Sequence, residues 1–355
     1  MSRIGADLKF QDGSCQLAAS PLATLDEIVG LGLDGLLVRT LDEAFPELDA
    51  DDLAAFHRTS QALGLFVRMG IGKINPYSTA ELPRVRSLGA GSYLAGMERM
   101  IRICASYGWN EVWTAVGSFK MAYPAPYCFD RFRTDVAWPA QLDATSRFID
   151  KLAPTLRAEG VRLNIETHEE ITTRELLVFV ERHGADIIGI CLDPANLPVR
   201  GESVIAGSQR VAPFTHLTHL RDVVLVPRAD GISRLLTPIG QGQIAWDRLL
   251  PLLLGRDDVD LCIEAIGRSR ADMLLQPGDP RWRASDPDLS EPELAELQAL
   301  ADQTAERFAD GSSPDLAATP APEYRDFLSQ SLQALRLLVE GNAPLTPAHD
   351  PAPSA

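Results

Sequence analysis

The sequence of 355 residues has no apolar run of about 18 residues, and its first residues hold no apolar signal core. We therefore expect neither a membrane span nor secretion. Lysine and arginine form no dense cluster, and the formal net charge is −16. A nucleic acid or an anionic membrane is consequently not expected as a partner. A glycine-rich phosphate loop is also missing.

Cysteine is scarce, and its spacing suggests no pairing. The sequence has Cys15, Cys104, Cys128, Cys191 and Cys262, an odd number without a Cys-x-x-Cys motif. We therefore expect a reduced protein of the cytoplasm. Cys191 and Cys262 lie in apolar strand-like runs, so we interpret them as core residues rather than reactive thiols. An apolar content of 45% allows a large core.

Short strand-like runs alternate with amphipathic helix-like stretches, which is typical of parallel strands joined by crossover helices. We expect strands near residues 3–10, 35–40, 65–71, 111–117, 161–167, 188–193, 217–223 and 260–265. We expect helices near residues 23–31, 50–63, 90–107, 138–158, 172–183, 202–212 and 245–254. Eight strands predict a closed (β/α)8 TIM barrel, because a doubly wound sheet usually has about five or six.

The chain divides into a barrel, a C-terminal helical extension and a disordered, proline-rich tail, at residues 1–310, 311–341 and 342–355. A helix near 290–308 is expected to close the barrel, and a second helix is expected near 322–340. Long connections at 73–88 and 118–135 should lie on the face where the strands end, which is the catalytic face of such barrels. They fit either lids or packed surface loops.

Four of the later strand-like runs end in a group that can bind a cation or move a proton. These candidates are Glu166, Asp193, His219 and Glu264. One such residue alone is more often a helix cap or a loop residue, but in a barrel these four neighbouring strand ends can converge. Three carboxylates buried together would repel one another, and a divalent metal ion would resolve that conflict. The oxygen-rich set favours Mn²⁺, Mg²⁺ or Co²⁺, with Zn²⁺ as an alternative.

The same segments resemble a known family. They are Ile165-Glu166-Thr167-His168, Leu192-Asp193-Pro194-Ala195-Asn196, Thr218-His219-Leu220-Arg221-Asp222, the turn at 240–246, and Ile263-Glu264. They are similar to xylose isomerase-like barrels, and more narrowly to the sugar phosphate isomerase/epimerase superfamily, which includes ketose 3-epimerases, inosose dehydratases and endonuclease IV. The resemblance covers about residues 160–266, and the N-terminal half matches only by strand pattern. It implies one divalent ion bound by Glu166, Asp193, His219 and Glu264.

Four further residues are expected near a substrate. Asn196 stands where the epimerases of that superfamily have a substrate-contacting histidine, which disfavours epimerase chemistry. His168 shares a strand face with Glu166 and suits proton transfer, or else orients that glutamate. Arg221 fits a substrate oxygen, a ligand carboxylate or a surface ion pair. Lys9 follows the first strand and could polarise a carbonyl.

These observations and the resemblance lead us to expect a metal-dependent enzyme that abstracts a proton next to a sugar carbonyl, with Glu166, His168 and Glu264 as catalytic residues. Isomerisation, epimerisation and β-elimination share a metal-bound enolate, and the sequence leaves the choice open. Endonuclease IV is excluded, because it needs more histidines and a basic face.

Asn196 and four loop aromatics favour a lyase acting on a keto-sugar or 3-oxo-glycoside. The aromatics are Tyr77, Tyr123, Tyr127 and Phe129. This description resembles the barrel subunit of C-glycoside deglycosidases, which has a small β-sandwich partner. A homo-oligomer is the other assembly expected. The alternative function is a non-catalytic, metal-stabilised sugar-binding or scaffold subunit.

Overall fold

The computed structural model describes residues 3–10, 13, 15–78, 82–117, 120, 123–125, 127–311, 316 and 319–342. The expected tail, apart from Asn342, lies outside these residues. Eight parallel strands form the barrel wall: β1 (Ile4–Leu8), β2 (Gly35–Val38), β3 (Phe66–Gly70), β4 (Glu111–Thr114), β5 (Arg162–Glu166), β6 (Ile188–Leu192), β7 (Thr215–Thr218) and β10 (Leu261–Ile263). Their order is β10-β1-β2-β3-β4-β5-β6-β7, and a bridge between Leu220 and Ile263 links the two ends. The predicted (β/α)8 barrel is therefore confirmed.

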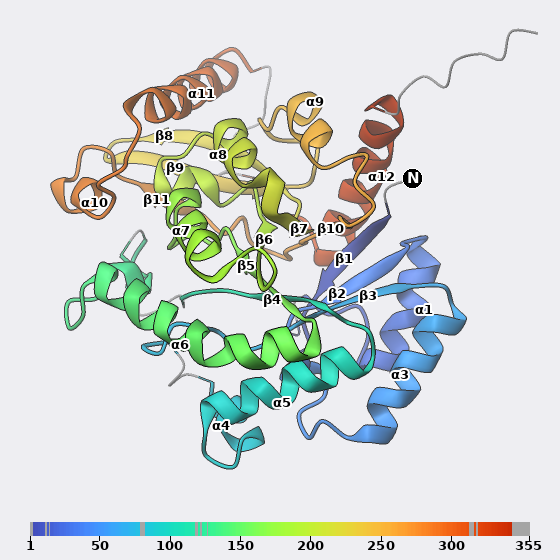
Figure 1. Ribbon diagram of the computed structural model, residues 1–355. Coiled ribbons are helices and arrows are strands. Elements are labelled where there is room, and N and C mark those ends of the chain that lie inside the picture. The colour runs from blue at the N-terminus through green and yellow to red at the C-terminus, as the bar shows by residue number, and fades with distance from the viewer. Residues whose placement is uncertain are drawn as a thin grey trace, which may run out of the picture.

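Helices cover the outside of this wall (Figure 1). They are α1 (Pro21–Leu31), α3 (Ala50–Ala62), α5 (Tyr93–Ser106), α6 (Trp138–Glu159), α7 (Thr173–His183), α8 (Val204–Val211) and α9 (Trp246–Leu249), with the short α2 (Leu41–Ala44) and α4 (Pro83–Leu88). Several begin at a side-chain cap, as where Asp49 accepts from the backbone N–H groups of Asp51 and Asp52. Their apolar faces pack on the strands in one continuous core.

The C-terminal helices depart from the expectation. The helix predicted to close the barrel is α11 (Glu291–Ala309), but it packs on β8 (Asp222–Arg228) instead of the barrel wall. The closing position belongs to α12 (Tyr324–Asn342), which contacts β10 and α9. Figure 1 shows α12 beside β10 and β1, while α11 lies across the hairpin at the top. Both helices are amphipathic, so periodicity alone could not tell which one faces the barrel.

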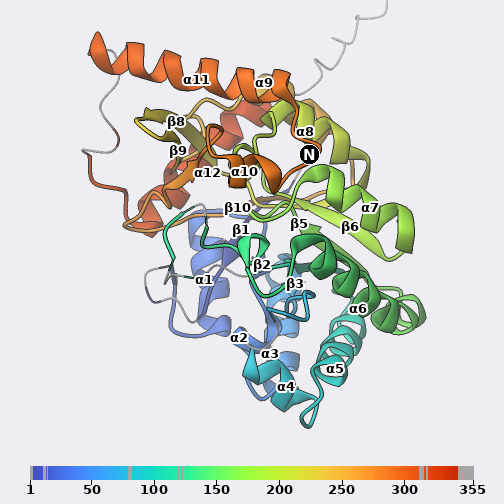
Figure 2. The ribbon, with the colours of Figure 1, turned by 90° about the vertical axis from the view of Figure 1, so that its left-hand side faces the viewer.

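A second, three-stranded antiparallel sheet lies on the barrel's upper side (Figures 1 and 2). It has the order β11-β9-β8, with β9 (Gly231–Thr237) and β11 (Met273–Leu275). The strand expected at 217–223 is therefore two elements, because the chain leaves the wall after β7 and enters this hairpin. Asp222 fixes the departure: its carboxylate accepts from the backbone of Gly240 and Ile244 and from the indole of Trp246.

The barrel interior changes character from bottom to rim. Its lower part is a small apolar cluster that includes Leu217, Cys191 and Cys262, and both cysteines are buried and unpaired. Burial raises the pKa of each thiol well above its ordinary value, which agrees with inert core residues. Two residues further along, on the same faces, the side chains are acidic or imidazole. Within the described residues, no helix is both long and apolar enough to cross a membrane.

Candidate metal centre and active site

Three of the four predicted ligands meet inside the rim. Glu166 ends β5, His219 follows β7, and Glu264 follows β10. Within the described chain, one ligand atom from each lies within 4.8 Å of the other two, and all three residues are buried. Nδ1 of His219 is 3.0 Å from Oε1 of Glu166 and 3.7 Å from Oε2 of Glu264. This Glu/His/Glu cluster could hold a metal ion.

Asp193, the fourth predicted ligand, is bound by Arg221 instead of joining that cluster. Nε of Arg221 donates to Oδ2 of Asp193 at 2.9 Å, and Nη2 donates to the same oxygen. The other carboxylate oxygen accepts from the backbone N–H of Ala195 at 2.9 Å. Nη2 of Arg221 also lies 3.0 Å from Oε2 of Glu264 and donates to Oδ1 of Asn196. Arg221 thus connects two predicted ligands with Asn196.

A second ion-pair network was missed by sequence reasoning. Arg39, just after β2, donates to Asp7 at 2.6 Å and to Glu264. Nζ of the predicted residue Lys9 is 3.8 Å from Oε1 of Glu264. Nε2 of His219 is 3.7 Å from Oδ1 of Asp7. The protein's own cations therefore relieve part of the repulsion that led us to expect an ion. The only sequence signal was that Asp7 and Arg39 also stand at strand ends.

Glu166 is held in its ionised form. Burial would raise its pKa, but the imidazole of His219, which also shares a hydrogen bond with it, and the nearby His168 lower that pKa to about 2. The indole of Trp113 donates to Oε2 of Glu166 at 3.2 Å. The Trp113 ring lies 5.7 Å from the His219 ring, and the guanidinium of Arg39 lies 5.1 Å from the Trp113 ring.

His168 lies between two acids that follow it in the chain. Nδ1 contacts Oε2 of Glu170, and Nε2 is 3.3 Å from Oε2 of Glu169. Burial would lower the pKa of His168, but these carboxylates outweigh it and raise the pKa to about 9. Arg234 of β9 donates to Glu169 at 2.6 Å, so the hairpin helps to position the histidine's partner. At neutral pH His168 is therefore an imidazolium and a proton donor.

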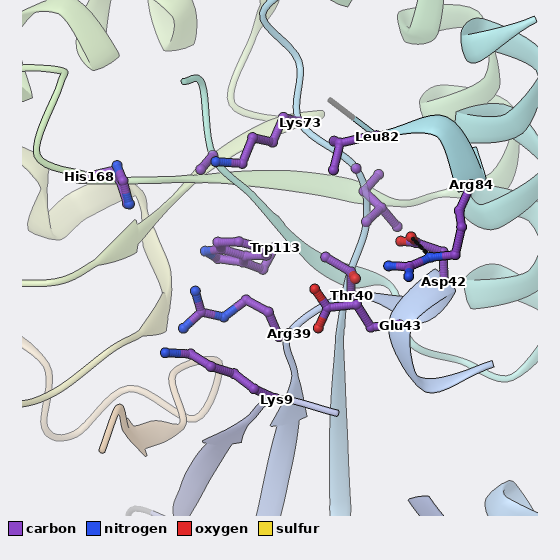
Figure 3. A pocket seen from close by; sticks show the side chains of 13 residues that line it. Lys9, Arg39, Thr40, Asp42, Glu43, Lys73, Leu82, Arg84, Trp113 and His168 are labelled. Carbon is purple, nitrogen blue, oxygen red and sulfur yellow. Dashed lines mark hydrogen bonds and ion pairs between the residues drawn. The ribbon is translucent and has the colours of Figure 1, made fainter. Parts of the chain in front are cut away.

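A cavity of about 340 Å³ opens beside the cluster, because Lys9, Arg39 and Trp113 of its wall contact Glu264 or Glu166. Figure 3 shows the side chains that line it. Lys9, Arg39, Lys73, Trp113 and His168 are among its lining residues. Nζ of Lys73 donates to the carbonyl oxygen of Gly117, and burial lowers the pKa of this lysine. Sequence reasoning gave Lys73 no role. Basic side chains thus outnumber acidic ones among the described lining residues, since Arg84 is also basic and the acids are Asp42 and Glu43.

The loop aromatics that favoured a bulky substrate are placed elsewhere. Tyr123, Tyr127 and Phe129 line a separate depression of about 620 Å³. The ring of Tyr77 lies 5.9 Å from the guanidinium of Arg133. None of the four is among the described residues that line the cavity beside His168.

Comparisons with known proteins agree with this architecture. A family model described as "Xylose isomerase-like TIM barrel" matches residues 25–286. The uncharacterized protein YihM of Escherichia coli is 26% identical over 113 residues, which are 32% of this chain and 35% of YihM. The match thus spans about a third of that curated relative.

Solved structures of similar shape include several sugar epimerases. The 3-keto-D-glucoside 4-epimerase YcjR of E. coli has a TM-score of 0.53 at 13% identity, over 84% of this chain and 100% of YcjR. D-psicose 3-epimerase of Clostridium cellulolyticum has a TM-score of 0.55 at 11% identity, over 85% and 98%. A xylose isomerase-like protein of Mycobacterium smegmatis, in complex with magnesium, has a TM-score of 0.55 at 18% identity, over 85% and 98%. At these identities the likeness shows the fold.

Proposed function

This chain belongs to the xylose isomerase-like TIM barrel family, and from that membership we propose that it is an enzyme that moves a proton at the carbon next to a sugar carbonyl. The observation that supports the proposal most is the buried cluster of Glu166, His219 and Glu264, which lies beside a cavity that His168 helps to line. Acidic and imidazole groups beside one cavity support acid–base chemistry on a small-molecule substrate. The named epimerases of similar fold support an isomerase or epimerase.

The three clustered residues would hold one divalent ion, with Mn²⁺ proposed first and Mg²⁺, Co²⁺ or Zn²⁺ as alternatives. Two observations support the fit: the donors are mainly oxygen, and within the described chain Oε2 of Glu264 is buried without a hydrogen-bond partner. When bound, such an ion polarises a carbonyl or hydroxyl oxygen as a Lewis acid. A sugar or glycoside is the proposed substrate, and the charge of −16 gives no reason to propose a nucleic acid or membrane partner.

Different side chains donate and accept the protons in this reaction. His168 donates a proton to the substrate oxygen on which negative charge develops, because its two acidic neighbours keep it protonated. The carboxylate of Glu166 or Glu264 accepts the proton from carbon. Lys9 and Arg39 lie on the cavity wall, where their donors can orient substrate oxygens. The same groups serve isomerisation and epimerisation, which differ in where the proton returns.

β-Elimination is the second candidate, because Asn196 rather than histidine lies three residues after Asp193. An amide is neither an acid nor a base at neutral pH, and His168 is the one histidine among the described residues that line the cavity. Such a site suits loss of a leaving group better than two-sided proton exchange. Cleavage of a 3-oxo-glycoside, together with a small β-sandwich subunit, would be such a reaction, and a homo-oligomer is the alternative assembly. We also propose a cytoplasmic location, since Cys104, Cys128, Cys191 and Cys262 are free thiols.

Hydrogen exchange in D₂O tests the chemistry. The protein is incubated with Mn²⁺ and a panel of ketoses, inososes and 3-oxo-glycosides, and NMR follows deuterium in the recovered sugars. We expect incorporation at one carbon beside a carbonyl, and a loss of about a hundredfold or more in His168→Gln. If no sugar exchanges hydrogen while sugars still raise the melting temperature, the protein is a sugar-binding or scaffold subunit and the proposal is wrong.

A further inference from the structure

Arg221 occupies the space between two carboxylates that the family resemblance assigns to the ion. Its Nη2 atom donates to Oδ2 of Asp193 and lies 3.0 Å from Oε2 of Glu264. Arg221 is 6% exposed, and Asp193 and Glu264 are 0% and 3% exposed. A guanidinium this deeply buried between two carboxylates neutralises their charge, as a metal ion would do there.

The surrounding charges point the same way. Four buried carboxylates meet at the rim, those of Asp7, Glu166, Asp193 and Glu264. Arg39, Arg221 and Lys9 contribute three positive charges that contact them directly. Only one negative charge is then left over, before any charge on His219 is counted. A divalent ion added to this arrangement would leave an excess of positive charge in a buried site.

Asp193 is also satisfied without an ion. Oδ2 receives both Arg221 donors, and Oδ1 receives the backbone N–H of Ala195. Glu264 differs, because its Oε2 has no hydrogen-bond partner in the described chain although Arg221 is near. Glu264 is therefore more available to bind a metal ion than Asp193.

We propose that Arg221 is a built-in counter-cation that keeps Asp193 out of the ion's ligand set and competes with the ion for Glu264. The inference rests on the proposed function in one respect, because it assumes the same three ligands, Glu166, His219 and Glu264. In the native protein the ion has three protein ligands and binds weakly. Removing the guanidinium frees Asp193, which becomes a fourth ligand.

Binding of Mn²⁺, measured by the EPR signal of the free ion, tests this inference without any assay of activity. We expect Arg221→Met to bind Mn²⁺ about ten- to a hundredfold more tightly than the native protein. The double variant Arg221→Met, Asp193→Asn should lose that gain. Arg200→Met is the matched control, because Arg200 is another buried arginine but contacts the carbonyl oxygen of Val199 and none of the four rim carboxylates.

Asp193→Asn in the native background gives a second measurement if Arg221→Met does not fold. The asparagine keeps one acceptor oxygen for Arg221, while its NH2 group replaces the oxygen that accepts from Ala195. We expect Mn²⁺ affinity to change less than about threefold. A loss of tenfold or more would show that Asp193 is a ligand and would overturn the inference. Equal or weaker binding of Mn²⁺ by folded Arg221→Met would also overturn it.

The inference and the proposed function can fail separately. If Arg221→Met binds Mn²⁺ and the native protein does not, the inference holds and the metal-dependent form of the proposed function fails. If deuterium enters a sugar after chelation, the proton-transfer proposal survives without an ion. If Mn²⁺ binds to neither protein, the inference is wrong whatever the exchange assay shows.

Discussion

His168 owes its charge to the two residues that follow it. Glu169 and Glu170 turn back towards the imidazole, and each is fixed from another part of the chain: Arg234 holds Glu169, and the backbone N–H of Gly117 holds Glu170. The sequence predicted that His168 lies on the same side of the chain as Glu166. Its protonation state could not be predicted, because Arg234 lies 65 residues further along the chain than Glu169.

We expect Glu170→Gln to lower the pKa of His168 from its value of about 9. The amide still accepts from Gly117 but no longer attracts the imidazolium. Because the folded pKa lies above the ordinary 6.5, the native ion pair stabilises the protein fully below about pH 6.5 and is lost as pH rises through 9. NMR titration of the histidine ring protons, assigned with His168→Gln, measures the pKa.

The free energy of unfolding gives an independent measurement of the same pair. The difference between native protein and Glu170→Gln should shrink as pH rises through 9. Glu181→Gln, an exposed position on α7, is the control and should leave the His168 titration unchanged. An unchanged pKa in Glu170→Gln would show that this carboxylate does not set the charge of His168.

At the scale of single elements, glycine sets how closely β2 approaches β3. A Cβ atom on Gly35 would lie 2.4 Å from both the ring and the carbonyl oxygen of Phe66. We expect Gly35→Ala to lower the free energy of unfolding by about 1–3 kcal/mol, because neither the backbone nor the packed ring can move freely. Urea denaturation measures the change.

Gly30 provides the matched comparison, because it lies inside α1 and a Cβ there would meet no atom within 4 Å. Gly30→Ala should raise the free energy of unfolding by about 0.5–1 kcal/mol through helix propensity. If both variants shifted stability in the same direction, the close approach at Gly35 would not be the cause.

The start of α7 links the loop that carries His168 to the barrel's outer layer. Thr172 and Glu175 form a capping box, and Glu175 also accepts from Arg131 and Trp138. We expect Thr172→Ala to cost about 1 kcal/mol, measured by urea denaturation, and Thr172→Ser to cost much less since it keeps the hydroxyl. Equal losses in both variants would mean that the cap is not what stabilises this helix.

Local patterns predicted these elements better than they predicted contacts between them. Period-two alternation predicted Glu166 and His168 on one strand face, although β5 ends at Glu166 and His168 follows it. Strand ends identified His219 and Glu264. The same patterns could not show that Arg221 faces Asp193 rather than a substrate, or that Arg39 reaches Glu264. Such pairs depend on how distant strands are arranged around the barrel, and the sequence of one segment does not determine that arrangement.

At the scale of the whole molecule, the C-terminal helix is tied to the rim. The hydroxyl of Tyr324, at the start of α12, donates to the backbone carbonyl of Asp7 at 3.1 Å. Phe327, Leu328 and Leu335 of the same helix are fully buried. The last helix of the described chain therefore supports the first strand, whose Asp7 belongs to the network around Glu264.

That network predicts how the whole protein responds to metal removal. Because Arg39, Arg221 and Lys9 already balance most of the rim's negative charge, dialysis against EDTA should leave the circular dichroism spectrum unchanged and shift the melting temperature by no more than about 2–3 °C, equivalent to less than about 1 kcal/mol. Readdition of Mn²⁺ at a hundred times its Kd should raise the free energy of unfolding by about 2.7 kcal/mol, and the melting temperature should rise accordingly. Glu264→Gln, which keeps the shape but removes a ligand charge, should abolish that rise. Unfolding on chelation would contradict the prediction, because an ion that the fold needs cannot be one that Arg221 replaces.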